Sequence, residues 1–351
     1  MTWQASKVFS TDCQSYEFAS PAHPSQRAKA QEGDFGGTPV TAKDIEPVAV
    51  AMQSSQGFRP ETVGLILETI SGWEVTSDRP FGSCTREELA AAALRNSVDD
   101  VEIAEILAAI DALILRGQDL EGEPLQHWEQ ERRPARLMTK PIVQIPDGTL
   151  RLLPWQSHGT WRVFQAYLGE GRSIWQAAGV PKALQDELAA FVHRRNLDLE
   201  RDVAAELRKL TPHVKENIKK PKVLGLTSAE WANVGEIDAI AVDEATKTVW
   251  VAEAKDLFSP FSPSTVRRSY EKYFNSEDGY VKKLLKKTEM VRNNRIAVTA
   301  SLGVDSSPED WHVEPVMVTR RTEPAGFARS SPVPFCALGT LVQFILAKRS
   351  V

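Results

Sequence analysis

Two carboxylates and a lysine interrupt apolar segments in the second half of the chain, at Asp238, Glu253 and Lys255. Carboxylate oxygens are ligands that Mg²⁺ prefers in proteins. A lysine beside such an ion can orient or deprotonate a water molecule, or stabilise charge that develops at phosphorus. If the fold brings the three side chains together, these residue types therefore predict metal-assisted hydrolysis.

The segments that carry these residues are predicted to form a β-hairpin, because both are apolar and a short polar stretch separates them. If Asp243 faces Thr248 across a four-residue loop, the numbers of each opposed pair add to 491. Asp238 then lies opposite Glu253. Lys255 shares their face of the sheet, because residues two apart in a strand point the same way.

Carboxylates that are directly opposed in an antiparallel pair have Cβ atoms about 5 Å apart and repel each other. A divalent cation between them reverses the sign of the interaction, so removal of one carboxylate, as in Asp238→Ala, is expected to relieve repulsion in the metal-free protein. Charged residues on one strand face also occur on solvated surfaces. Here, however, Ile240 and Val251 are expected to share the face of the carboxylates, which favours a buried site. Glu236 is expected opposite Lys255 as its partner across the hairpin.

The arrangement resembles the active site of the PD-(D/E)xK nuclease superfamily, over residues 190–351. The resemblance implies that Asp238 and Glu253 bind Mg²⁺ or Mn²⁺ together with the backbone carbonyl of Ala254, and that Lys255 activates water. It also implies that a glutamate of the preceding helix assists in positioning the metal, for which Glu200 is the best match and Glu206 a weaker one. Ile237 replaces the proline of the family name, and the basic helix lacks the Q-x-x-x-Y motif of the exonuclease-like subgroup.

The segments around the motif predict an α/β fold in which helices flank a mixed sheet. Their order, α-β-β-β-α-β with a β-α extension, is the restriction-endonuclease-like core that the resemblance implies. The expected elements are a helix over 185–210, strands over 222–226, 234–242 and 248–254, a basic helix over 266–295, strands over 312–319 and 333–337, and a helix over 341–347.

Two basic clusters flank the motif and favour a nucleic acid as partner. Residues 1–180 carry 16 Lys and Arg against 24 Asp and Glu, whereas residues 181–351 carry 26 against 23. Like charges four apart on a helix repel, and a phosphate backbone would relieve that repulsion. A merely solvated lysine face remains the alternative. The lysines assigned to nucleic-acid binding are Lys219, Lys220, Lys282, Lys283, Lys286 and Lys287.

The length of 351 residues and the shifts in composition predict three parts. These are a flexible N-terminal arm (1–39), a mainly helical accessory domain with a small β-hairpin (40–180) and the nuclease-like domain (181–351). Three scattered cysteines argue for a reducing cytoplasm and against a zinc knuckle or a disulfide framework. No segment is typical of a signal peptide or a transmembrane helix, so we expect a cytoplasmic protein without membrane contact.

The function expected from these observations is a Mg²⁺-dependent endonuclease that hydrolyses phosphodiester bonds of DNA. Two alternatives stay open. One is a catalytically silent nucleic-acid-binding or assembly module that keeps the fold, and the other is an enzyme of the same fold that cleaves RNA. A homodimer, or a partner protein bound through the N-terminal region, is also left open.

Overall fold

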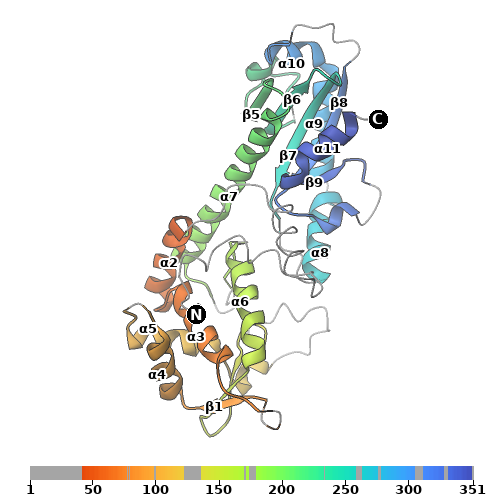
Figure 1. Cartoon of the computed structure of the whole chain (residues 1–351). Coiled ribbons are helices and arrows are strands. Elements are labelled where there is room, and N and C mark those ends of the chain that lie inside the picture. Colours follow the sequence, from red (N-terminus) through yellow and green to blue (C-terminus); the bar gives the residue numbers. More distant parts are fainter. Residues whose placement is uncertain are drawn as a thin grey trace. The chain divides into compact units, whose positions relative to one another are not determined.

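The computed structural model describes residues 42–349, except for 77, 79, 99, 122–135, 170, 174–178, 233, 258–262, 276–277, 305–310 and 328–330. The predicted N-terminal arm therefore lies outside the described residues. The protein is a mixed α/β protein with two mixed sheets (Figure 1). It divides into two compact units, one formed by the described residues up to His193 and one by those from Arg194 onward. Within the described ranges, no helix is long and apolar enough to cross a membrane.

In the described residues, the first unit combines α2 to α6 and the first part of α7 (Lys182–Arg208, up to His193) with a four-stranded sheet in the order β1-β4-β3-β2. The predicted hairpin is present as β3–β4, and two further strands extend it, β1 antiparallel to β4 and β2 parallel to β3. The elements are α2 (Ala42–Gln56), α3 (Pro60–Ser71), β1 (Gly82–Cys84), α4 (Arg86–Asn96), α5 (Ile103–Leu113), β2 (Ile114–Leu115), β3 (Ile142–Gln144), β4 (Leu150–Leu152) and α6 (Pro154–Gly169).

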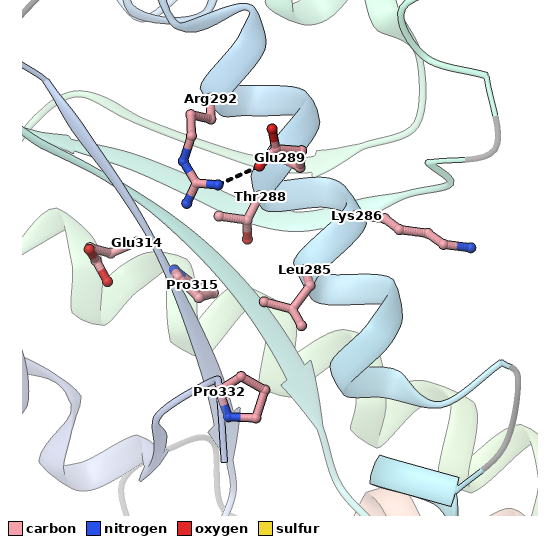
Figure 2. Close-up of a pocket in the computed structure, with 8 residues that line it drawn as sticks. All are labelled: Leu285, Lys286, Thr288, Glu289, Arg292, Glu314, Pro315 and Pro332. Carbon is pink, nitrogen blue, oxygen red and sulfur yellow. Dashed lines mark hydrogen bonds and ion pairs between the residues drawn. The ribbon is translucent and has the colours of Figure 1, made fainter. Parts of the chain in front are cut away.

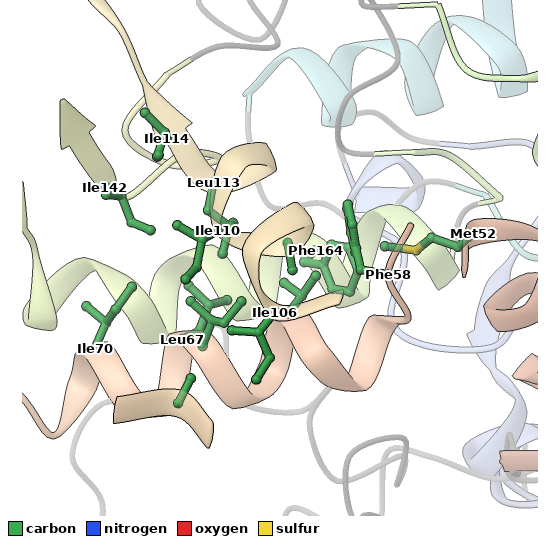
Figure 3. Packing of buried hydrophobic residues seen from close by; sticks show 14 of the residues in the cluster. Met52, Phe58, Leu67, Ile70, Ile106, Ile110, Leu113, Ile114, Ile142 and Phe164 are labelled. Atoms are coloured by element: carbon green, nitrogen blue, oxygen red, sulfur yellow. The ribbon is translucent and has the colours of Figure 1, made fainter. Parts of the chain in front are cut away.

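Apolar side chains from α3, α5 and α6 form the core of this unit. Leu67, Ile110 and Phe164 are buried in one cluster, in which they come from these three helices (Figure 3). A capping box begins α4, because the Thr85 hydroxyl accepts from Glu88 N at 3.1 Å while the Glu88 carboxylate accepts from Thr85 N at 2.8 Å.

The second unit is built on a five-stranded sheet in the order β5-β6-β7-β8-β9. β5, β6 and β7 are antiparallel, and β8 and β9 continue the sheet in parallel to β7. The elements are α7 (Lys182–Arg208, of which residues from Arg194 belong to this unit), β5 (Val214–Ile218), β6 (Ile237–Asp243), β7 (Thr248–Lys255), α8 (Pro263–Tyr270), α9 (Tyr280–Asn293), α10 (Arg295–Ser301), β8 (His312–Thr319), β9 (Phe335–Ala337) and α11 (Leu341–Arg349).

The predicted hairpin register is confirmed. Ala239 faces Ala252 and Asp243 faces Thr248, so the opposed residue numbers add to 491. The Asp243 carboxylate closes the turn by accepting from the backbone N–H of Ala245 at 3.2 Å and from the Thr246 hydroxyl at 2.9 Å.

Two predicted elements differ from the structure. Residues 221–224 form a 3₁₀ helix rather than a strand, since Pro221 favours the first turn of a helix, and the first strand of the sheet is β5 instead. The expected single basic helix over 266–295 is divided into α8, a π-helical segment (Glu271–Asn275) and α9, and α10 begins at its last residue. Gly279 precedes α9, and Asn294 separates α9 from α10 with the non-helical angles φ −119° and ψ 24°.

Helices cover both faces of the five-stranded sheet. On one face, Leu199 and Val203 of α7 and Leu341 of α11 pack against small residues such as Ala239 and Ala252. On the other face, buried residues of α9 and α10 pack against β-branched residues of the hairpin: Leu284, Val291, Val298, Ile240, Val242, Val249 and Val251. Asp238, Glu253 and Lys255 belong by alternation to this second face, as expected from the sequence.

Candidate active site

Asp238, Glu253 and Lys255 meet where β6 begins and β7 ends. The Lys255 ammonium lies 3.2 Å from Asp238 Oδ2 and 2.8 Å from Glu253 Oε1, and it donates to the backbone carbonyl of Ala254 at 2.8 Å. Asp238 Oδ2 also accepts from the Ala254 N–H at 2.8 Å, which fixes its carboxylate against β7. The hairpin register therefore brings the three predicted side chains into direct contact.

The site is enclosed by protein. Asp238 and Glu253 are 4% and 3% exposed, and the side chain of Lys255, at 20%, is the most accessible of the three. The Lys255 ammonium also lies 5.4 Å from the centre of the Tyr280 ring at the start of α9, a cation–π contact. Because little water screens these charges, their mutual interactions are stronger than on the surface.

A second lysine completes the charge balance of this site. Lys287 of α9 is 5% exposed and forms an ion pair with Glu253 Oε2. Two carboxylates thus face two ammonium groups, and each oxygen of Glu253 has a different cationic partner. Lys287 therefore lies inside the unit rather than in the exposed lysine cluster to which the sequence assigned it. The expected repulsion between Asp238 and Glu253 is offset within the protein itself.

The pKa values in the site follow from burial and from these contacts. Burial and the charge of Glu253 raise the pKa of Asp238. Burial disfavours the charged form of Glu253, but the combined effect of Lys255 and Lys287 outweighs it and lowers the pKa of this carboxyl. Burial likewise opposes the charge on Lys255, yet Glu253 and Asp238 raise its pKa, so this lysine is a cation at neutral pH.

Glu200 comes from α7, which packs on the opposite face of the sheet from the hairpin carboxylates. Burial raises the pKa of Glu200 to about 7, and the nearby charge of Asp238 adds to this shift. Glu200 is thus half-buried and within electrostatic range of the site. Glu206, six residues further along α7, forms an exposed ion pair with Lys209 at 2.5 Å.

Glu236 does not pair with Lys255 as expected. Its carboxylate lies 3.3 Å from the Lys219 ammonium, because the directions of β5 and β6 bring the start of β6 next to the end of β5. Lys255 is instead held by Asp238 and Glu253.

The remaining lysines assigned to nucleic-acid binding are exposed: Lys219, Lys220, Lys282, Lys283 and Lys286. A pocket of about 460 Å³ lies between α9 and β8, and Lys286 extends away from its other lining side chains (Figure 2). In this pocket Arg292 is paired with Glu289, and Glu314 also lines it. Its charges are of both signs, so the pocket is not a basic groove.

A buried ionic cluster next to the site was not found from the sequence. Asp256, the residue after Lys255, accepts from Arg195 of α7 at 2.9 Å and from Arg320 at 3.0 Å. Arg320 also donates to the backbone carbonyl of Arg195 at 2.9 Å. The cluster connects α7 to the ends of β7 and β8, and therefore fixes the backbone that carries Lys255. The sequence signal was weak, because arginines 125 residues apart show no pattern.

The oxygen atoms around Lys255 Nζ are chemically suited to a hard divalent cation. The two carboxylates and the Ala254 carbonyl are the donor set that the resemblance implies for Mg²⁺, and here they all contact one cation, the ammonium of Lys255. Among the residues that the structure describes, no group of three or more His, Cys, Asp or Glu side chains is placed to hold a metal. A metal in this site thus requires the Ala254 carbonyl as a further protein ligand, because Glu200 does not complete a group of three carboxylates with Asp238 and Glu253.

Comparison of the chain with protein-family models, with curated proteins and with solved structures found no match.

Proposed function

We propose that the chain is a metal-dependent nuclease of the PD-(D/E)xK superfamily that hydrolyses phosphodiester bonds of DNA, with endonuclease activity favoured. One observation carries the proposal: Asp238, Glu253 and the Ala254 carbonyl, the donors that the resemblance implies, converge on a single cation in a buried site. The order α7-β5-β6-β7-α9-β8 is consistent with the α-β-β-β-α-β core of that superfamily.

In this proposal the protein residues have separate roles. Asp238 and Glu253 hold Mg²⁺ or Mn²⁺ with the Ala254 carbonyl, and Glu200 assists from α7. When bound, the ion supplies Lewis-acid stabilisation of charge on the phosphate oxygens. Lys255 leaves the donor set and, as a cation, orients the attacking water and stabilises negative charge that develops at phosphorus. The exposed Lys282, Lys283 and Lys286 of α9 contact the phosphate backbone on either side.

The electrostatics support this role for Lys255. Its pKa is raised by two carboxylates, so in the protein without metal it donates hydrogen bonds and does not act as a base. If Asp238 and Glu253 held a divalent ion, they would attract the Lys255 ammonium less strongly than they do in the metal-free protein. Lys255 has the most accessible side chain of the three and is therefore the one that can turn toward a substrate.

The catalytically silent module is the second candidate, and one observation favours it. Lys255 and Lys287 neutralise both carboxylates, so the site is electrostatically satisfied without a metal. Under that alternative the fold keeps a structural ion network, and the exposed lysines bind nucleic acid without cleaving it.

Cleavage assays distinguish these functions. Supercoiled plasmid, single-stranded DNA and single-stranded RNA of matched sequence are incubated with the full chain in Mg²⁺, Mn²⁺ or EDTA. Asp238→Asn and Lys255→Met are the site variants, and Asp198→Asn, which breaks an exposed ion pair with Arg201, is the control. The proposal predicts metal-dependent DNA cleavage that both site variants lose and the control keeps. Equal DNA binding by all proteins without cleavage would support the silent module. Cleavage of RNA but not of DNA would mean that RNA, not DNA, is the substrate.

A further inference from the structure

Lys287 differs from the other lysines of α9 in the direction of its side chain. Lys282, Lys283 and Lys286 are exposed, whereas Lys287 is 5% exposed. It is three residues after Leu284 and four before Val291, both fully buried against the sheet. The position thus belongs to the apolar stripe of the helix, where a cation requires a buried partner.

That partner is one particular oxygen of Glu253. Lys287 pairs with Oε2, while Oε1 contacts the Lys255 ammonium at 2.8 Å. Lys255 in turn contacts Asp238 Oδ2 and the Ala254 carbonyl. Oε1 therefore points to the donor set, and Oε2 is held on the side of α9.

This division limits how Glu253 can coordinate a metal. Lys255 has a partly accessible side chain and can leave the donor set. Lys287 is buried between α9 and the sheet, so loss of its contact with Oε2 would leave a buried ammonium unpaired. With Oε2 engaged, Glu253 offers a single oxygen to an ion. Mg²⁺ takes six ligands in near-octahedral geometry, whereas Ca²⁺ takes six to eight and often binds both oxygens of one carboxylate.

We propose that Lys287 is a positioning residue that makes Glu253 a one-oxygen ligand, so that the site selects Mg²⁺ over Ca²⁺. The inference rests on the proposed metal site and adds its selectivity. Lys287 acts through Glu253 and contacts neither the ion nor the substrate.

The test is calorimetric titration of the metal-free full chain with Mg²⁺ alone and with Ca²⁺ alone. Lys287→Met removes the ammonium and keeps an apolar stem in the stripe, and Lys287→Leu is a second variant that suits a buried helix position. Lys286→Met on the exposed side of α9 is the matched control. Lys287→Arg keeps a cationic donor near Oε2 and serves as the conservative replacement.

The proposal predicts that wild type binds Mg²⁺ more tightly than Ca²⁺. In Lys287→Met or Lys287→Leu the ratio of the two dissociation constants shifts toward Ca²⁺ by about tenfold or more, while Lys286→Met and Lys287→Arg keep the wild-type ratio. Loss of positive charge alone would strengthen the binding of both metal ions by the same factor. An unchanged ratio of the two dissociation constants therefore overturns the proposal. Equal binding of the two ions by wild type overturns it without any variant.

The same titrations distinguish a failure of this inference from a failure of the proposed function. If Asp238→Asn abolishes Mg²⁺ binding but the Lys287 variants leave the ratio unchanged, the metal site stands and its selectivity has another source. If wild type binds neither ion, the metal site itself is wrong, and the role of Lys287 in selectivity is wrong with it.

Discussion

Replacement of Glu253 by glutamine should strongly destabilise the metal-free protein. Glu253 is the ion-pair partner of Lys287 and one of two carboxylates around Lys255, and it is 3% exposed. Glu253→Gln leaves the Lys287 ammonium buried without a carboxylate. Removal of one partner of a buried ion pair costs about 3–5 kcal/mol in the free energy of unfolding. Because about 1 kcal/mol shifts the melting temperature of a domain of this size by about 2–4 °C, we expect a decrease of roughly 6–20 °C.

A double-mutant cycle separates the ion pair from other effects of the substitution. Thermal and urea unfolding are measured in EDTA for wild type, Glu253→Gln, Lys287→Met and the double variant. The double variant removes both charges and leaves Lys255 paired with Asp238. Its loss in the free energy of unfolding should therefore be smaller than the sum of the losses in the two single variants, by more than about 1 kcal/mol. Asp198→Asn is the control, because an exposed pair contributes about 0–1 kcal/mol.

Two results would refute this reasoning. A loss in Glu253→Gln no larger than that of Asp198→Asn would mean that the buried lysines do not depend on this carboxylate. Additive losses in the cycle would mean that Glu253 and Lys287 do not interact. Asp238→Ala should also destabilise the metal-free protein, because Lys255 loses a partner. The relief of repulsion expected from the sequence is therefore corrected.

Three further predictions follow from neighbouring groups. Burial raises the pKa of Glu200 from 4.5 to about 7, so the native state holds this proton more tightly than the unfolded chain and wild type loses stability as the pH rises through that window. In EDTA, the melting temperature of Glu200→Gln should therefore rise relative to that of wild type as the pH increases from 5 to 8. A difference in melting temperature that does not depend on pH would contradict this. Arg320→Met should lower the free energy of unfolding, measured in urea, by about 3 kcal/mol, because Asp256 loses one of two buried partners. An unchanged urea midpoint would show that Arg195 alone suffices to neutralise Asp256. Lys286→Ala should reduce the slope of log K for DNA binding against log salt concentration by about one unit, because an exposed lysine that contacts a phosphate releases a counterion. Lys287→Ala should leave this slope unchanged, because Lys287 is buried. Equal slopes for the two variants would contradict the assignment of Lys287 to the interior.

Local patterns in the sequence predicted the centre of the site. The turn between Asp243 and Thr248 sets the register of the hairpin, and a register with period two decides which side chains share a face. The contacts of Lys255 with Asp238 and Glu253 follow from that register alone.

The contributions of distant segments were harder to predict. Lys287 was assigned to a basic surface because of its charge, although its spacing from Leu284 and Val291 places it on the buried stripe of α9. The partner that makes this position tolerable, Glu253, is 34 residues away. The strand expected over 222–226 failed for a local reason, since Pro221 begins a 3₁₀ turn and the apolar pattern alone does not distinguish that turn from a short strand.

The central claim is that the oxygen atoms around the Lys255 ammonium form a divalent metal site. The most direct test is diffraction from crystals of the full chain soaked in Mn²⁺, with data collected at a wavelength where manganese scatters anomalously. The account predicts one anomalous peak among Asp238, Glu253 and the Ala254 carbonyl, with the Lys255 side chain turned out of the donor set, and no such peak in Asp238→Asn. Full Mn²⁺ occupancy elsewhere, with Lys255 still between the two carboxylates, would contradict it.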